Sequence, residues 1–137
     1  MKNKKNNPFD IILSETPNFS EEEAIHLAKK HYDIEASAEN LVSERDQNFL
    51  LRTTDGRKFV LKIANSEEDP IVTDFQICAL IHINKINDNR ISVPEIKFSR
   101  GNRKSIVLTK EKKSFVTRVV TYLDGEPLFT SKKSIPD

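Results

Sequence analysis

The chain has 137 residues, of which 36% are hydrophobic and 31% charged, with 22 basic and 21 acidic side chains. These values fit one small globular domain or part of a larger protein, and they exclude collagen and a wholly disordered chain. No apolar run approaches the roughly 18 residues of a membrane-spanning helix, so no membrane partner is expected. A single cysteine, Cys78, excludes an internal disulfide, and the start lacks a secretory signal, which together predict a cytoplasmic location.

The first elements of the chain are an arm and a helix. Residues 1–17 show little periodicity and are expected to form a flexible N-terminal arm. Ser20-Glu21-Glu22-Glu23 then matches a capping box, in which the serine and the third glutamate satisfy backbone donors of the first turn, and predicts a helix of about 12 residues. Its buried side should carry the residues at i, i+3, i+4 and i+7, namely Ala24, Leu27, Ala28 and His31.

A hairpin is expected next, because the pattern changes to short β-type runs after Asn40. Residues 49–54 and 57–64 flank Asp55-Gly56. This dipeptide predicts a two-residue type I′ turn, in which both central residues have positive φ.

A long helix is predicted to begin at Asp69-Pro70, because aspartate is a good N-cap and proline fits the first helical position. The residues that come next at helical spacing are Ile71, Phe75, Cys78, Ala79, His82 and Ile86. The helix should end near residues 87–89. Extended segments are expected at 93–99, 105–109 and 115–123, with a polar turn at 110–114. The sum is an α+β fold, an antiparallel sheet of about five strands with one long helix packed across it and a preceding N-terminal helix.

Lys62 is the most informative single residue in the predicted strands. Alternation places it between Val60 and Ala64, on the face opposite Phe59, Leu61 and Ile63. Taken alone, it is a lysine that extends its ammonium group to solvent at a sheet edge. A strand lysine in a hairpin followed directly by a helix also matches the smaller lobe of a protein-kinase-like fold, where it contacts the phosphates of ATP.

Several segments together resemble the aminoglycoside phosphotransferase family, especially the branch that includes hydroxylysine kinases. They are, in chain order, Glu44-Arg45-Asp46-Gln47-Asn48-Phe49, Phe59-Val60-Leu61-Lys62-Ile63-Ala64-Asn65, Asp74-Phe75-Gln76, Val93-Pro94 and Tyr122-Leu123-Asp124-Gly125-Glu126-Pro127-Leu128. The resemblance covers about residues 18–130. It implies that residues 18–123 form the N-terminal, ATP-clamping lobe of a small-molecule kinase, and that 124–137 form the hinge and the start of a linker to a C-terminal lobe.

The resemblance also implies which residues meet the nucleotide. Lys62 would contact the α- and β-phosphates, and the turn at 43–48 would cover them although it contains no glycine. The candidate ligands of that turn are Arg45, Asp46, Gln47 and Asn48. The hinge that contacts adenine would be Thr121, Tyr122 and Leu123.

A side chain of the long helix is expected to orient Lys62, as the resemblance implies. Gln76 occupies the position of the lysine-orienting glutamate, and Asp74 is the alternative. The two lie about 200° apart on the helix, so only one of them can face the site. The sequence leaves this choice open.

No catalytic residue is assigned within the chain, because the groups that position the hydroxyl and bind Mg²⁺ belong to the C-terminal lobe of such kinases. Residues 1–137 alone are therefore predicted to be inactive, and Mg²⁺ is expected only with that lobe. The implied partners of the full-length protein are ATP and a small hydroxyl compound, such as hydroxylysine or a related amino alcohol.

Two other functions remain open at this stage. A non-catalytic module would use the exposed surface of the lobe for partner binding or self-association. A nucleic-acid binder would use the basic stretch at 97–118, which contains eight basic side chains and one acidic one. Nucleic acid is the less favoured partner, because only Phe98 and Phe115 interleave those charges for base stacking.

Overall fold

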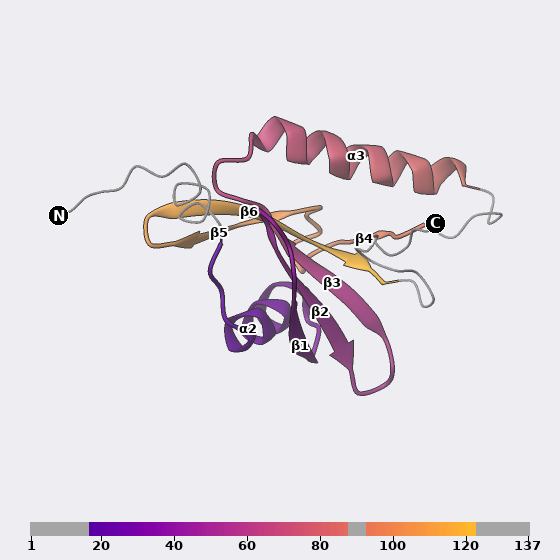
Figure 1. Cartoon of the computed structure of the whole chain (residues 1–137). Helices are drawn as coiled ribbons and strands as arrows, with labels where there is room; N and C mark the ends of the chain where they lie inside the picture. The colour runs from indigo at the N-terminus through magenta and orange to yellow at the C-terminus, as the bar shows by residue number, and fades with distance from the viewer. Residues whose placement is uncertain (1–16, 88–92, 123–137) are drawn as a thin grey trace, which may run out of the picture.

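The computed structural model describes residues 17–87 and 93–122. They form one sheet with a helix on each face (Figure 1). The elements are α2 (Glu21–Tyr32), β1 (Ala36–Leu41), β2 (Gln47–Thr53), β3 (Lys58–Ile63), α3 (Pro70–Ile86), β4 (Ile96–Lys97), β5 (Ile106–Lys110) and β6 (Lys113–Thr121). The predicted α+β fold is confirmed, while the expected arm, except for residue 17, and the expected hinge and linker at 124–137 lie outside the described residues.

All strand pairs of the sheet are antiparallel, and the strand order is β1-β2-β3-β6-β4, with β5 also paired to β6. The last strand, β6, therefore lies beside β3, although α3, β4 and β5 separate the two in the chain. As a result β3 has a hydrogen-bonded neighbour on each side. The expectation that strands begin after Asn40 was wrong for β1, which starts at Ala36.

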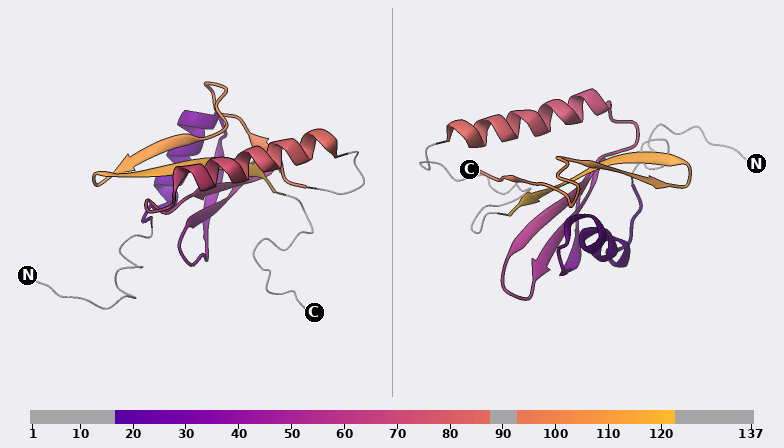
Figure 2. Two further views of the ribbon diagram at one scale, coloured as in Figure 1. Left: turned by 90° about the horizontal axis from the view of Figure 1, so that it is seen from above. Right: turned by 180° about the vertical axis from the view of Figure 1, so that it is seen from behind.

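Each face of the sheet carries its own hydrophobic core, and the two helices cover opposite faces (Figure 2). The larger core lies under α2 and contains Ala24, Ala28, Tyr32, Phe49, Leu51, Phe59, Leu61, Ile63, Phe115 and Val119. The smaller core lies under α3 and contains Leu50, Val60, Ile77, Ile96 and Val120. Successive residues of β3 alternate between the two cores, as the pleat of a strand requires.

Contacts at both of its ends fix α2 in place. The capping box is present, because Ser20 accepts a hydrogen bond from the Glu23 amide and the Glu23 side chain accepts one from the Ser20 amide. The Lys110 ammonium of β5 lies 2.9 Å from Glu23 Oε1. At the other end Asp33 adopts a left-handed conformation, and the carbonyl of His31 accepts a 2.8 Å hydrogen bond from the Arg100 amide.

The long helix α3 begins as predicted, since the Asp69 side chain accepts a 2.9 Å hydrogen bond from the Ile71 amide. However, its buried residues are Thr73 and Ile77, joined by the partly buried Leu80 and Ile81. Of the residues noted at helical spacing, all but the partly buried Ala79 are exposed, namely Ile71, Phe75, Cys78, His82 and Ile86. The sheet-facing side was hard to recognise because it also carries Asn84, whose amide donates to the Pro94 carbonyl at 2.8 Å.

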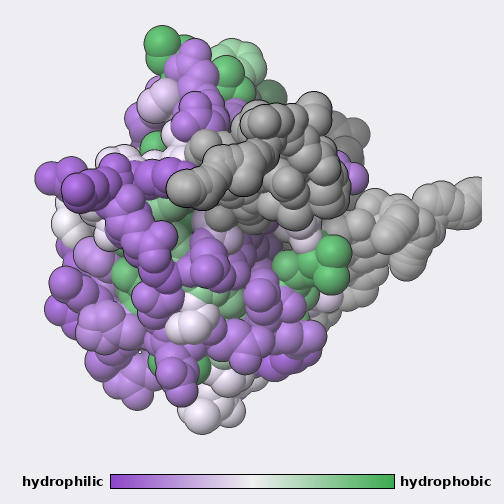
Figure 3. Space-filling view, turned by 60° about the vertical axis from the view of Figure 1, so that its left-hand side comes forward, coloured by the Kyte–Doolittle hydropathy of each residue, from purple (hydrophilic) through white to green (hydrophobic). Residues whose placement is uncertain are grey.

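Hydrophobic side chains are consequently visible on the outside of α3. A largely hydrophilic face of the molecule shows hydrophobic groups at its upper end, on the side of α3 (Figure 3). Ile71 is 76% exposed and Phe75 is 73% exposed. Within the described ranges, neither helix has the length and apolar character needed to cross a membrane.

The type I′ turn was predicted at the wrong hairpin. Between β2 and β3 the Gly56 amide donates to the Thr53 carbonyl, and only Gly56 in this turn has positive φ, at 93°. This pattern is a type I turn followed by a left-handed glycine, which closes a three-residue loop. The two-residue turn with positive φ at both positions lies instead between β5 and β6, at Glu111 (54°) and Lys112 (67°).

We expect Lys112→Gly to stabilise the protein, because a left-handed conformation costs a residue with a side chain about 1 kcal/mol. The gain should raise the melting temperature by about 4 °C in a chain of this size. Thr54→Gly is the matched control, since Thr54 is an exposed turn residue without positive φ. Thermal unfolding followed by circular dichroism should show the control unchanged or less stable, and a rise in both variants would contradict this account.

Candidate functional site

Lys62 lies in the middle of the sheet, on the face covered by α3. It alternates with Leu61 and Ile63 of the α2 core and shares its face with Val60 of the α3 core. Its register partners are Asn48 of β2 on one side and Arg118 of β6 on the other. Asn48, Lys62 and Arg118 therefore form a cross-strand polar row beneath α3, with Asn48 buried and the two cations partly buried.

Burial lowers the pKa of both cations in the polar row. Burial lowers the pKa of Lys62, the Arg118 guanidinium lowers it further, and the Asp46 carboxylate opposes both effects. Burial also lowers the pKa of Arg118, against the pull of Asp46 and Glu68. Within the described residues, Asp46 is thus the carboxylate that acts on both cations. The arrangement creates a partly desolvated region of positive potential, which suits an anionic ligand.

A buried amide, Asn65, holds Asp46 close to this row. The Asn65 backbone amide donates to Asp46 Oδ1 at 3.1 Å, and its side-chain amide donates to the Arg45 carbonyl at 3.2 Å. Its side-chain oxygen accepts a 2.8 Å hydrogen bond from the Glu67 amide. The residue therefore ties the β1–β2 turn to the segment after β3. Sequence reasoning did not single it out, although a polar residue directly after an apolar strand was a usable signal.

Gln47 and Asn48 lie in β2 rather than in the turn that precedes it, and their side chains serve opposite faces. Gln47 forms two hydrogen bonds with the backbone of Phe19, at 2.7 and 2.8 Å, on the α2 side of the sheet. Asn48 faces α3, and its side-chain oxygen is buried without a hydrogen-bond partner among the described residues. The structure thus brings Asn48 and Asp46 to Lys62 and places the Gln47 side chain elsewhere.

The two candidate residues of α3 lie on either flank of its buried side. Asp74 forms an ion pair with Lys104, at 3.2 Å, and raises the pKa of that lysine. Gln76 is exposed. The carboxylate that favours the protonated form of Lys62 is that of Asp46, in the β1–β2 turn. Orientation of Lys62 by Gln76 or by Asp74 stays a prediction.

The residues predicted to form the hinge lie at the end of β6, with Thr121 as the last residue of the strand and Tyr122 directly after it. The Thr121 amide donates to the Glu95 carbonyl at 2.9 Å, and the Tyr122 amide donates to the Lys58 carbonyl at 3.1 Å. The Lys58 ammonium lies over the Tyr122 ring, 5.5 Å from its centroid. Leu123 lies outside the described residues.

The basic stretch at 97–118 does not form one free cationic face. Arg100 pairs with Asp33 at 3.2 Å, Lys104 pairs with Asp74, and Lys110 pairs with Glu23. Arg118 belongs to the polar row. These partners reduce the charge available for a phosphate backbone, which disfavours nucleic-acid binding.

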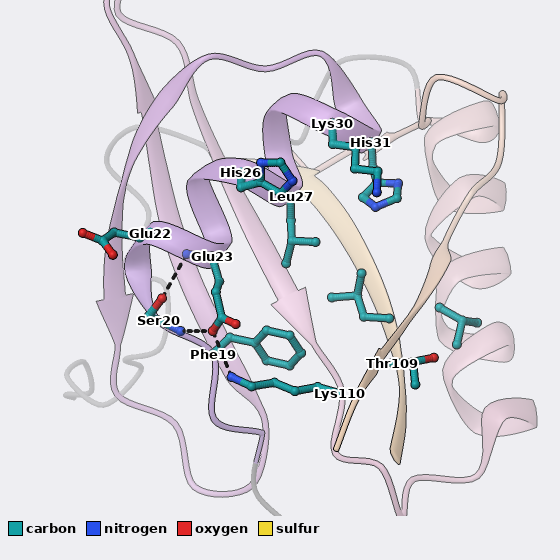
Figure 4. A pocket seen from close by; sticks show the side chains of 12 residues that line it. Phe19, Ser20, Glu22, Glu23, His26, Leu27, Lys30, His31, Thr109 and Lys110 are labelled. Carbon is teal, nitrogen blue, oxygen red and sulfur yellow. Dashed lines mark hydrogen bonds and ion pairs between the residues drawn. The ribbon is translucent and has the colours of Figure 1, made fainter. Parts of the chain in front are cut away.

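A separate groove of about 520 Å³ lies on the other face, between α2 and β5. Figure 4 shows Lys110 beside Phe19 at one end, and His26, Lys30 and His31 at the other. Burial, Lys30 and His26 together lower the pKa of His31. The groove contains the ion pair that attaches α2 to the sheet, and no residue predicted to bind the nucleotide lines it. Among the described residues, no group of three or more potential ligand side chains forms a metal site.

We expect Asn65→Ala to lower the free energy of unfolding by about 2 kcal/mol, because it leaves the Arg45 carbonyl and the Glu67 amide without their buried partner. Urea denaturation provides the measurement. Asn40→Ala, at an exposed position of β1, should change stability by less than about 0.5 kcal/mol. Equal effects at the two sites would show that the Asn65 tether is not important.

Lys62→Met should stabilise the protein by about 1 kcal/mol at neutral pH, because it removes a partly buried charge that faces Arg118. The folded-state pKa of Lys62 is lowered below its ordinary value of 10.5. The charge therefore costs stability below the lowered pKa, and this cost disappears as the pH rises toward 10.5.

Melting temperatures of both proteins between pH 7 and 10.5 test this expectation, and the gain from Lys62→Met should shrink over that range. Lys85→Met, on the exposed side of α3, is the control and should have no effect. A destabilised Lys62→Met variant at pH 7 would show that its ion pairs outweigh its burial.

Comparisons with known proteins identify the fold. No family model matches the chain, and no curated protein matches it in sequence. The solved structures that match the fold include a microcompartment-associated aminopropanol kinase, with a TM-score of 0.61 and 18% identity over 73% of this chain and 31% of that one. They also include amicoumacin kinase hAmiN in complex with AMP-PNP, Ca²⁺ and Ami, with a TM-score of 0.58 and 14% identity over 83% of this chain and 34% of that one.

The chain thus spans about a third of the length of each matched kinase. At 18% and 14% identity, the similarity shows a shared fold and does not show a shared reaction. The two helices and the antiparallel sheet of this chain have the fold of a kinase N-terminal lobe.

Proposed function

We propose that this chain is the ATP-binding portion of a kinase that phosphorylates a hydroxyl group of a small molecule. The observation that carries the proposal is the position of Lys62, partly buried beside a second cation on the sheet face beneath the long helix. A lysine placed in this way on a kinase N-terminal lobe is suited to bind the α- and β-phosphates of ATP. The polar row fits an anionic group, because it contains two cations and a buried amide.

The remaining nucleotide contacts are proposed from the same surroundings. The β1–β2 turn, with Arg45 and Asp46, would lie over the phosphates, held there by Asn65. The backbone amides of Thr121 and Tyr122 already donate hydrogen bonds to protein carbonyls. The adenine contacts are therefore assigned to the carbonyl groups of these two residues and to the backbone of Leu123.

The transfer step would depend on parts of a kinase that the described residues do not include. Phosphoryl transfer relies on metal ions and on a carboxylate that positions the attacking hydroxyl. We assign no such residue here, and we expect residues 1–137 alone to show no phosphotransferase activity. As acceptor we propose a small amino alcohol of the hydroxylysine type, in keeping with the sequence resemblance and with one matched kinase being named for aminopropanol.

We expect residues 1–137 to bind ATP with a dissociation constant of about 1 mM or weaker, because one lobe supplies only half of a cleft. NMR chemical-shift titration suits this affinity range. Lys62→Ala should abolish the binding, whereas Lys112→Ala should not, since Lys112 lies in the distant, exposed β5–β6 turn.

Equal loss of binding in both variants would mean that ATP is attracted non-specifically to basic side chains. In that case the assignment of Lys62 as a nucleotide ligand would be withdrawn. Saturable binding of ATP in Lys62→Ala would have the same consequence.

A second candidate function, partner binding without catalysis, is favoured by the outer side of α3. Ile71, Phe75 and Ile86 are each more than two-thirds exposed, and they lie along one side of the helix. Exposed apolar groups in such a row are typical of a protein interface. This function does not require Lys62, so the titration above separates it from the first.

A further inference from the structure

We infer that Arg118 is a second phosphate ligand, which acts with Lys62 as a two-cation clamp for linked phosphate groups. The inference rests on the proposed nucleotide site and extends it to a residue outside the predicted set. It also specifies the ligand, because two adjacent cations favour a diphosphate or triphosphate over a single phosphate.

The register of the sheet places the two cations side by side. Lys62 and Arg118 are direct partners of β3 and β6. Side chains that face each other across antiparallel strands have Cβ atoms roughly 4.5–5.5 Å apart and leave the same side of the sheet. The neighbouring pair, Val60 and Val120, belongs to the core beneath α3, so the two cations also project toward α3. One polyphosphate chain can therefore contact both of them.

Two cations side by side on one sheet face repel each other, and burial adds to the cost of their charges. Like charges directly opposite each other destabilise a sheet, and burial increases the cost of each charge. Asp46, the carboxylate acting on both, is exposed to water and also accepts a hydrogen bond from the Asn65 amide. Its charge is therefore partly screened. An anion that bridges Lys62 and Arg118 would relieve their repulsion directly.

The buried amide of Asn48 is a third polar group beside the two cations. Asn48 is 6% exposed, lies opposite Lys62, and its side-chain oxygen has no hydrogen-bond partner among the described residues. Buried polar groups are normally satisfied, so this amide calls for a partner that the described residues do not supply. Rotation of the amide by 180° would present its NH₂ group, a donor, to a phosphate oxygen.

Arginine and lysine would have different tasks in this clamp. The guanidinium group presents a planar fork of donors that matches two phosphate oxygens, whereas the ammonium group acts as a compact point charge. Arg118 would thus fix the orientation of the phosphate chain, and Lys62 would neutralise it. Arg118→Lys should therefore restore only part of the function.

The test compares AMP, ATP and inorganic tripolyphosphate as ligands of residues 1–137, titrated by NMR at low ionic strength. Arg118→Met should weaken ATP and tripolyphosphate about tenfold, equivalent to about 1.4 kcal/mol, and should change AMP less than twofold. Arg118→Lys should give an intermediate loss. Arg103→Met, in an exposed turn, should leave all three affinities unchanged. Amide spectra without ligand would show whether each variant is folded.

Two results would overturn the inference: ATP binding by Arg118→Met at the strength of the unsubstituted chain, or an equal loss of AMP and ATP. If Arg118→Met does not fold, the same comparison is made with Arg118→Lys. A failure of the proposed function would give a different result. The clamp would still bind tripolyphosphate through Lys62 and Arg118, but ATP would bind no more tightly than tripolyphosphate, because no adenine contact would add to the affinity.

Discussion

The pairing of β3 with a strand on each side is the constraint on which the rest of this lobe depends. A strand with two neighbours and a helix over each face can expose little of its surface. Alternation then sends Phe59, Leu61 and Ile63 into the α2 core and leaves the α3 face to Val60 and Lys62. The register of β3 with β2 and β6 then determines which side chains lie beside Lys62. The chemistry of the site is thus a result of the sheet topology.

The surrounding elements hold this sheet through a few polar contacts rather than through apolar area alone. Asn65 joins the β1–β2 turn to the end of β3, and Gln47 joins β2 to the segment before α2. Lys110 joins β5 to α2. Asn65 and Gln47 form hydrogen bonds with backbone groups that lack a backbone partner among the described residues, and Lys110 forms an ion pair with a distant part of the chain. The contacts of Asn65 keep the turn near Lys62 in place without a glycine-rich loop.

Local signals in the sequence predicted much of the fold. The capping box at Ser20 and the Asp69-Pro70 pair located both helix starts, because these motifs act within one turn of helix. The turn type at Asp55-Gly56 was wrong, because only Gly56 has positive φ there. The outward side of α3 was prominent in the sequence because it is the more apolar one, whereas the sheet-facing side includes Thr73 and Asn84. Local apolar spacing alone therefore does not show which side of α3 packs on the sheet.

The candidate site was predictable only in part, for a related reason. Lys62 was identified from its own strand and from the helix that comes next in the chain. Arg118 was interpreted as one charge of a basic stretch, since its position opposite Lys62 depends on a pairing between distant strands. Asn65 and the burial of Asn48 likewise depend on tertiary structure. Residues whose role arises from long-range pairing are the ones that sequence patterns do not reveal.

The position of β6 also has a consequence for how the lobe folds. Strands β1, β2 and β3 are joined by short turns and can pair early. In contrast, β3 cannot pair with β6 until the ribosome has synthesised the intervening segment that contains α3, β4 and β5. Closing so long a loop costs chain entropy that local hairpins do not have to overcome. The cost of bringing Lys62 and Arg118 together therefore falls in a late step. A nascent chain can keep Lys62 hydrated until the last strand of the sheet is added.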